Sequence, residues 1–171
     1  MTIDMAGIAG GSIVDGPGIR TTYFAQGCPH HCEGCHNPET WDFGVGTPME
    51  TEALAAIARA NPLCRGVTFS GGEPFAQAEA FAELAEILKA DGYEIASYSG
   101  YTFEYLRDRG TGAQRKLLSL LDVLVDGPFV LARRSLDLVY RGSDNQRILD
   151  VPKSLAAGEP VLAPPRWQGE Y

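Results

Sequence analysis

The stretch Cys28-Pro29-His30-His31-Cys32-Glu33-Gly34-Cys35-His36 carries three thiols and directly follows an apolar run. Cysteine thiolates bind zinc ions and iron–sulfur clusters, and a short irregular loop lets several of them converge on one inorganic centre. A cubane of four irons held by only three thiolates would leave one iron without a protein ligand. That vacant iron is where chemistry would take place.

The composition limits the class of protein. The chain has 171 residues, 44% of them hydrophobic, which suits one domain with a substantial core. Its apolar runs are too short to span a bilayer and it lacks a signal pattern, so we expect a cytoplasmic protein with no membrane partner. Four cysteines, three of them close together, indicate metal binding and not a disulfide framework. A net charge of −8 disfavours nucleic acid as a partner.

Strand-like and helix-like segments alternate along the chain, which predicts parallel βαβ units. β-branched and aromatic residues mark the strands, and apolar residues at helical spacing mark the helices. The predicted strands are residues 20–26, 66–70, 93–97, 122–126 and 146–151, and the predicted helices are residues 47–60, an alanine-rich segment before Gly92, residues 102–108 and residues 113–121.

Three further segments carry specific local signals. Residues 7–19 are glycine-rich, but Asp15-Gly16-Pro17-Gly18 is typical of a turn before a strand, so we predict a hairpin and not a nucleotide site. Thr47-Pro48-Met49-Glu50 has the form of a helix capping box. Residues 152–171 contain four prolines and no clear period, so we predict a loosely packed tail after a domain of residues 1–151.

Candidate site residues follow four of the predicted strands. The carboxyl ends of parallel strands meet at one edge of the sheet, where ligands bind. We therefore expect the cysteine loop to lie beside Gly71-Gly72-Glu73-Pro74, whose glycines let the backbone approach a ligand. Glu73 can accept hydrogen bonds from an ammonium group. Ser99 and Asp126, which follow the next two strands, are further candidates for cofactor binding.

The cysteine loop followed by Gly-Gly-Glu-Pro resembles the radical S-adenosylmethionine superfamily. Other stretches resemble the activating enzymes of glycyl radical enzymes, and among these the activating proteins of anaerobic ribonucleoside-triphosphate reductase. This resemblance covers roughly residues 10–152 and implies a truncated TIM-type βα barrel with a mostly parallel sheet. The stretches that carry it are Val14-Asp15-Gly16-Pro17-Gly18-Ile19-Arg20, Cys35-His36-Asn37-Pro38-Glu39-Thr40-Trp41, Val123-Leu124-Val125-Asp126-Gly127-Pro128-Phe129 and Arg141-Gly142-Ser143-Asp144-Asn145-Gln146-Arg147.

The resemblance implies a cofactor set and a partner. Cys28, Cys32 and Cys35 would bind three irons of a 4Fe–4S cluster, and the amino and carboxylate groups of S-adenosylmethionine would bind the fourth. One electron, from a donor such as flavodoxin or ferredoxin, would cleave the sulfonium bond, and the 5′-deoxyadenosyl radical would take hydrogen from a glycine of the reductase. The residues implied to contact S-adenosylmethionine are Gly34, Cys35, His36, Gly71, Gly72 and Glu73.

Gly34 departs from the superfamily pattern, which often has an aromatic residue before the third cysteine. The reductase activators tolerate glycine there, so the departure favours that subfamily and puts ring stacking on adenine from this position in doubt. Other functions stay open. The chain could activate another glycyl radical enzyme, such as the pyruvate formate-lyase type, or act on a small molecule. A zinc module with His30, His31 or His36 as fourth ligand is a distant alternative, because no second pair of ligands is visible.

Several other residues have a structural or an undecided interpretation. Cys64 is predicted to be a buried small side chain without a redox role. Trp41 with Phe43 is predicted to belong to the core. Arg141 and Arg147 are candidates to bind a carboxylate bidentately, or to serve docking or structure, and the sequence alone does not separate these roles.

Overall fold

The computed structural model describes residues 1–169, which form a seven-stranded sheet with the order β3-β1-β2-β4-β5-β6-β7. The centre, β2-β4-β5-β6, is parallel, whereas β1, β3 and β7 join through antiparallel pairings. The fold is therefore a mixed α/β fold with a parallel sheet centre, as the alternation of segments predicted. The strands are β1 (Thr2–Ser12), β2 (Arg20–Ala25), β3 (Thr47–Glu50), β4 (Gly66–Gly71), β5 (Glu94–Tyr98), β6 (Val123–Asp126) and β7 (Arg147–Asp150).

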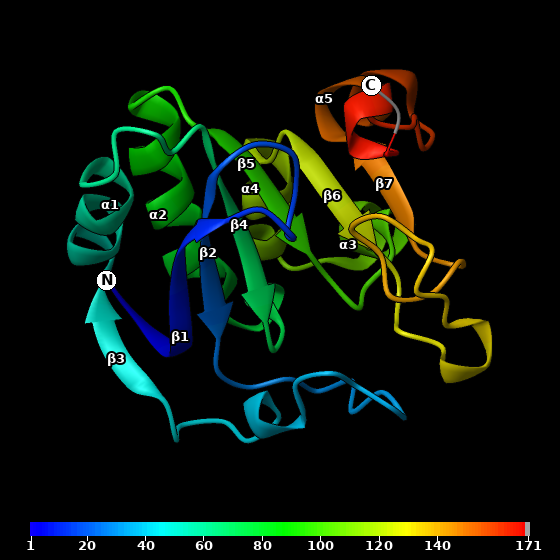
Figure 1. Ribbon diagram of the computed structural model, residues 1–171, viewed down its shortest axis with the longest axis horizontal. Helices are drawn as coiled ribbons and strands as arrows, with labels where there is room; N and C mark the ends of the chain where they lie inside the picture. The colour runs from blue at the N-terminus through cyan, green and yellow to red at the C-terminus, as the bar shows by residue number, and fades with distance from the viewer. Residues whose placement is uncertain (170–171) are drawn as a thin grey trace.

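Helices cover one face of this sheet (Figure 1). Their apolar sides and alternate strand residues, such as Tyr23, Phe69 and Leu124, form the larger core cluster. None of the helices in residues 1–169 combines the length and the apolar character needed to cross a membrane. The helices are α1 (Thr51–Arg59), α2 (Ala78–Ala90), α3 (Phe103–Arg109), α4 (Gly112–Leu120) and α5 (Val151–Ala157), with short 3-10 helices η1 (Pro38–Thr40), η2 (Pro74–Gln77), η3 (Leu131–Arg133) and η4 (Pro165–Trp167).

The other face of the sheet is covered by loops and by the C-terminal segment. Trp167 from η4 is fully buried there, with the Arg20 guanidinium 5.0 Å from its ring. Ala163 and Asp150 add backbone hydrogen bonds that tie the segment to β7. The prediction of a loosely packed tail is therefore wrong for residues 152–169. The sequence of this stretch has no periodic pattern, but the burial of Trp167 against the sheet holds it in place. Residues 170 and 171 of that predicted tail lie outside the described residues.

The local predictions for the first strands have mixed outcomes. The predicted hairpin is confirmed, since β1 and β2 pair antiparallel on either side of the glycine-rich turn. The capping box at Thr47–Glu50 is wrong: these residues form β3, and α1 begins at Thr51 without a side-chain hydrogen bond at its N-cap. Pairing with the edge of β1 satisfies the backbone groups of β3, which outweighs a local cap.

Candidate functional site

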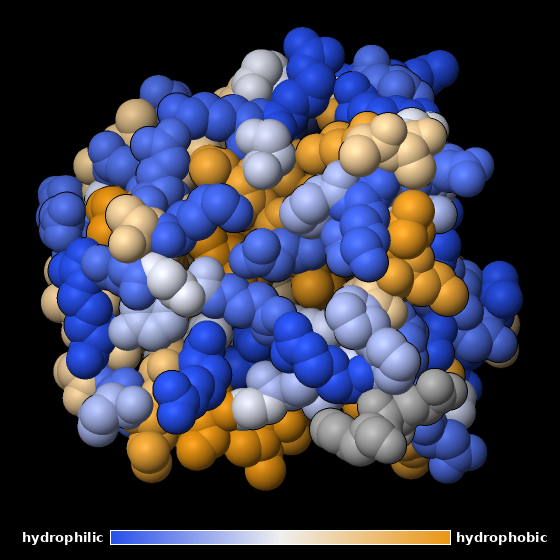
Figure 2. Space-filling model, turned by 90° about the horizontal axis from the view of Figure 1, so that it is seen from above, coloured by the Kyte–Doolittle hydropathy of each residue, from blue (hydrophilic) through white to orange (hydrophobic). Residues whose placement is uncertain are grey.

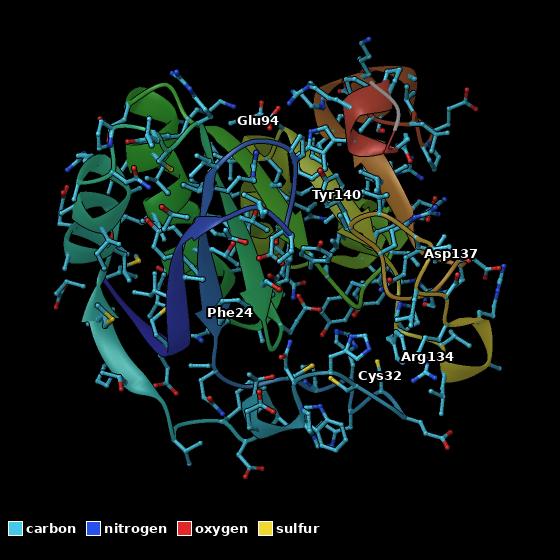
Figure 3. The ribbon with its side chains drawn as sticks, viewed as in Figure 1. Phe24, Cys32, Glu94, Arg134, Asp137 and Tyr140 are labelled. Carbon is cyan, nitrogen blue, oxygen red and sulfur yellow. The ribbon has the colours of Figure 1, made fainter. Side chains whose placement is uncertain are left out.

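A cavity of about 390 Å³ opens at the carboxyl ends of the parallel strands. Its wall contains Cys28, Cys32 and Cys35, which are all free thiols and partly buried. Segments that follow β4, β5 and β6 complete the wall, so the four strand ends meet as the sequence predicted. Cys32 lies on the loop below these strand ends (Figure 3). The other predicted site residues in the wall are His36, Gly71, Gly72 and Ser99.

The cysteine loop is closed at its base by backbone hydrogen bonds. The Gly27 N–H donates to the Thr40 carbonyl at 2.7 Å, and the Cys28 N–H donates to the Trp41 carbonyl at 3.1 Å. Thr40 is buried, so the base of the loop is anchored while the segment between these bonds stays irregular. An irregular backbone of this kind can aim several side chains at one point.

Gly34 is required by the geometry of the loop. It has a φ of 75°, and a Cβ at this position would lie 2.7 Å from Leu131 Cδ1. The Cys35 N–H donates to the Cys32 carbonyl at 3.0 Å across the same turn. A larger residue would therefore strain both the backbone and the packing. Gly34 itself does not form part of the cavity wall.

Glu73 is fully buried behind the cavity and is not part of its wall. Its Oε1 accepts hydrogen bonds from His30 Nε2 at 2.6 Å and from the Gly100 N–H at 2.8 Å, and its Oε2 accepts from the Phe75 N–H at 3.1 Å. The Ser99 hydroxyl lies 2.9 and 3.0 Å from the two oxygens. A carboxylate has about four acceptor positions, so these bonds fill it. Glu73 thus joins the cysteine loop to the ends of β4 and β5.

His30 is a residue whose place in the site the sequence reasoning missed, because it was weighed only as a zinc ligand. Its ring packs edge-on against Tyr101, with the ring centroids 4.5 Å apart. A Cβ on Gly100 would lie 2.4 Å from the imidazole, so the glycine leaves room for the ring. The available signal was its position between Cys28 and Cys32, on a loop that faces Glu73.

Asp126 is buried, is not part of the cavity wall, and binds neighbouring elements of the fold. It accepts hydrogen bonds from the Phe103 N–H at 2.8 Å and from Arg147 Nη2 at 2.5 Å. Arg147 also donates to Glu104 at 2.8 Å, and the hydrogen bonds to Asp126 and Glu104 raise the pKa of its guanidinium. Arg147 is therefore paired within the chain, whereas Arg141 lines the cavity.

The aromatic pair of the cysteine segment differs from the sequence prediction. Phe43 is 56% exposed, and Trp41 is partly exposed and stacks on His31 with the ring centroids 4.7 Å apart. The prediction that both belong to the core is wrong, because their segment lies outside the layer of helices. Cys64 is buried with its thiol 3.1 Å from the Gly66 carbonyl, which confirms its prediction as a small core residue.

The donor set fits an iron–sulfur cluster. Three free thiols from one loop face one cavity, and the Asn37 N–H donates to Cys35 Sγ at 3.4 Å, a contact that stabilises a thiolate. Burial raises the pKa of the Cys28 thiol, which coordination to iron would reverse. In residues 1–169 no three His, Cys, Asp or Glu side chains, these three thiols included, are gathered closely enough to hold a single metal ion.

Comparisons with known proteins agree with this donor set. The family model described as a 4Fe-4S single cluster domain matches residues 14–149. An anaerobic ribonucleoside-triphosphate reductase-activating protein from Vibrio cholerae is 37% identical over 144 residues, which are 80% of this chain and 90% of that protein. Proteins of the same name from Escherichia coli K12 and Enterobacteria phage T4 are 34% and 35% identical, covering 78% and 79% of this chain and 90% and 86% of their own lengths.

A solved structure, the crystal structure of QueE from Escherichia coli, resembles the chain with a TM-score of 0.50 and 20% sequence identity. The match covers 60% of this chain and 54% of the QueE chain, so it spans about half of that protein. At this level of identity the likeness concerns the fold alone.

Proposed function

We propose a function from the premise that the chain belongs to the 4Fe-4S single cluster family and, within it, to the anaerobic ribonucleoside-triphosphate reductase-activating proteins. The chain is a radical S-adenosylmethionine enzyme that generates a glycyl radical on anaerobic ribonucleoside-triphosphate reductase. The observation that carries this conclusion is the meeting of three free thiols with the Gly71-Gly72 turn in one cavity. A shared cavity lets an iron centre and an organic ligand lie in contact.

The three thiols would hold three irons of a 4Fe–4S cluster and leave the fourth for S-adenosylmethionine. When bound, the two cofactors supply a reductively formed radical that removes a hydrogen atom from a glycine Cα of the reductase. The electron comes from a small donor protein of the flavodoxin or ferredoxin class. The chain itself binds, orients and shields these groups from water.

The residues of the cavity wall are the direct contacts in this proposal. His36, Gly71, Gly72 and Ser99 would lie along S-adenosylmethionine, beside Cys35. Gly34, Glu73 and Asp126 lie outside the wall and would act by holding the loops in place. Direct binding of the methionine ammonium by Glu73 would require His30 or Ser99 to give up a hydrogen bond, since the carboxylate is already filled.

The proposal includes the architecture around the site. The parallel centre of the sheet corresponds to a truncated TIM-type βα barrel, and its outer strands β3 and β7 are not paired with each other in residues 1–169. A sheet that is not closed leaves its carboxyl edge accessible to a protein substrate. A cluster with reduced thiolates also suits the cytoplasm, where thiols are not oxidised to disulfides.

The decisive experiment is an anaerobic cleavage assay. The protein is reconstituted with iron and sulfide, reduced, and mixed with S-adenosylmethionine in the presence and absence of the reductase. We expect methionine and 5′-deoxyadenosine, and an electron paramagnetic resonance signal of a glycyl radical on the reductase. A reductase whose radical glycine is replaced by alanine is the matched control.

The same experiment separates the alternatives. Cleavage without a radical on the reductase would point to another glycyl radical enzyme or a small-molecule substrate. A colourless protein that holds one zinc ion and cleaves nothing would overturn the proposed function altogether.

A further inference from the structure

Arg141 differs from the other partly buried or buried arginines in residues 1–169. Each of the others has a carboxylate partner: Arg20 pairs with Glu94 at 2.9 Å, Arg107 with Asp108 at 2.8 Å and Arg147 with Asp126 at 2.5 Å. No ion pair of the described residues includes Arg141. A guanidinium stays charged at every relevant pH, so its partial burial without an anion costs free energy.

The guanidinium of Arg141 is held at the cavity wall by its neighbours. Its Nη1 donates to the Gln146 carbonyl at 3.0 Å, and the Gln146 side chain donates to the Gly127 carbonyl at the end of β6. Its Nε is buried and has no hydrogen-bond partner in the described part of the chain. This contact orients the guanidinium through Nη1 and leaves Nη2 and Nε without a hydrogen bond in the described residues.

No carboxylate of the described cavity wall forms an ion pair with Arg141. Arg141 is the one lysine or arginine of the described wall, and a second buried donor there, Trp41 Nε1, is also without a partner. The wall carboxylate, Asp15, already accepts hydrogen bonds from the Ser12 and Thr22 hydroxyls. The other titratable side chains of the wall are the three cysteines, two histidines and two tyrosines. Unpaired donors with a cation fit a ligand that carries a carboxylate.

We propose that Arg141 binds the carboxylate of the methionine moiety of S-adenosylmethionine. The proposal rests on the proposed function and adds a residue that neither the cysteine motif nor the Gly-Gly-Glu-Pro turn contains. A guanidinium pairs with a carboxylate through two parallel N–H···O bonds. One such pair would satisfy the buried Nε and neutralise the charge of Arg141.

The test compares S-adenosylmethionine with its decarboxylated form. Both compounds are titrated anaerobically, by equilibrium dialysis, into the reconstituted protein and into Arg141→Gln. We expect the substitution to weaken binding of S-adenosylmethionine about tenfold or more, and binding of the decarboxylated compound less than about twofold. Arg141→Lys restores part of the affinity, because it keeps the charge without the fork. Arg134→Gln, at an exposed position outside the wall, is the matched control.

Electron paramagnetic resonance of the reduced cluster gives a second readout. Saturating S-adenosylmethionine should change the spectrum of Arg141→Gln as it changes that of the unaltered protein, but at about tenfold higher concentration. Equal weakening for both compounds would show that Arg141 only orders its own loop and would overturn the proposal, as would unchanged binding. Normal binding with failure only toward the reductase would assign Arg141 to an acidic partner group and would also overturn it. An unaltered protein that binds neither compound would instead disprove the proposed function.

Discussion

The helix-free face of the sheet has two ends that are built in opposite ways. At the amino end, Arg20 is 1% exposed, lies against Trp167, and donates to Thr68 at 2.9 Å and to Glu94 at 2.9 Å. At the carboxyl end, irregular loops surround an open cavity whose wall contains three thiols. The outer surface seen from above in Figure 2 is hydrophilic over most of its area, with apolar groups between.

The amino end contributes to the stability of the fold, and the carboxyl end provides the site for chemistry. The amino end pairs its charges and buries a large aromatic ring, so it contributes free energy of folding. Within the described residues each end leaves one indole N–H without a partner, that of Trp167 at the amino end and that of Trp41 at the carboxyl end. The carboxyl end also leaves the Nε of the Arg141 guanidinium without one, which costs stability and suits a ligand. Substitutions at the amino end should therefore change the free energy of unfolding, and substitutions at the carboxyl end should change cofactor binding.

The largest contrast comes from exchanging one cysteine of the cavity wall and one of the larger core cluster, Cys64. Cys32→Ala removes a thiolate from the cavity wall, and we expect loss of the cluster and of all S-adenosylmethionine cleavage. Cys64→Ala, just before β4, should keep iron and cleavage and cost about 1 kcal/mol of stability. Iron and sulfide analysis together with the cleavage assay check both variants. Retention of a full cluster in Cys32→Ala would contradict the role of Cys32 as a cluster ligand.

Removing the buried aromatic ring tests the amino end. Trp167→Ala should lower the free energy of unfolding by about 3–5 kcal/mol, because Trp167 is fully buried against Arg20 and Tyr140. Urea unfolding followed by circular dichroism measures the change. Leu155→Ala, at a position 38% exposed, is the control and should lose less than about 1 kcal/mol. A loss of similar size in both variants would contradict a specific role for the C-terminal segment.

The charge pairing of the amino end should appear as a pH dependence. Burial acts to raise the pKa of Glu94, but hydrogen bonds from Arg166 and Arg20 outweigh it, and the pKa is lowered from 4.5. The ionised form is therefore favoured by folding, so its contribution is complete above pH 4.5 and is lost as the pH falls through the lower folded pKa.

Glu94→Gln tests this dependence. At pH 7 it should lower the free energy of unfolding by about 3 kcal/mol, because Arg20 stays buried without its carboxylate. The difference from the unaltered protein should shrink in acid, as measured by urea unfolding across pH 7 to 3. Glu52→Gln removes an ion pair with Arg59 at the surface and is the control. Its free energy of unfolding should differ little from that of the unaltered protein at any pH. A constant difference at all pH values would refute the ionic contribution.

The smallest predicted effect concerns His30, at the carboxyl end of the sheet. His30→Ala removes one hydrogen bond to the buried Glu73, so the cysteine loop loses an attachment to the end of β4. We expect about tenfold weaker binding of S-adenosylmethionine with iron content retained. His30→Gln keeps a donor and should recover most of the affinity. His31→Asn, at an exposed position of the same loop with a φ of 46°, should bind normally. Equal defects at His30 and His31 would indicate a general disturbance of the loop.

The sequence predicted the elements whose signals are local. The strands before the cysteine loop and before Gly71, and the helix face with Phe81 and Leu84, follow from apolar patterns and turn residues. The meeting of strand ends at one cavity followed from the parallel order alone. These predictions needed no knowledge of long-range contacts.

The wrong predictions depend on partners that are distant in the sequence. Thr47–Glu50 pairs with a strand at the very start of the chain, and Trp167 packs on Arg20 at the start of β2. Neither contact leaves a periodic signal. The contact between His30 and Glu73 is equally hidden, because a histidine between cysteines suggests a metal ligand and not a hydrogen-bond donor to a buried carboxylate.

The buried carboxylate of Glu73 also sets an order of events in maturation. Its two oxygens accept hydrogen bonds from His30 in the cysteine loop, from Phe75 in its own turn and from Ser99 after β5. In the unfolded polypeptide these segments are not in contact, so the metal site is not yet formed. The cysteine loop is therefore held in place to receive iron only in a chain whose β4 and β5 have already come together.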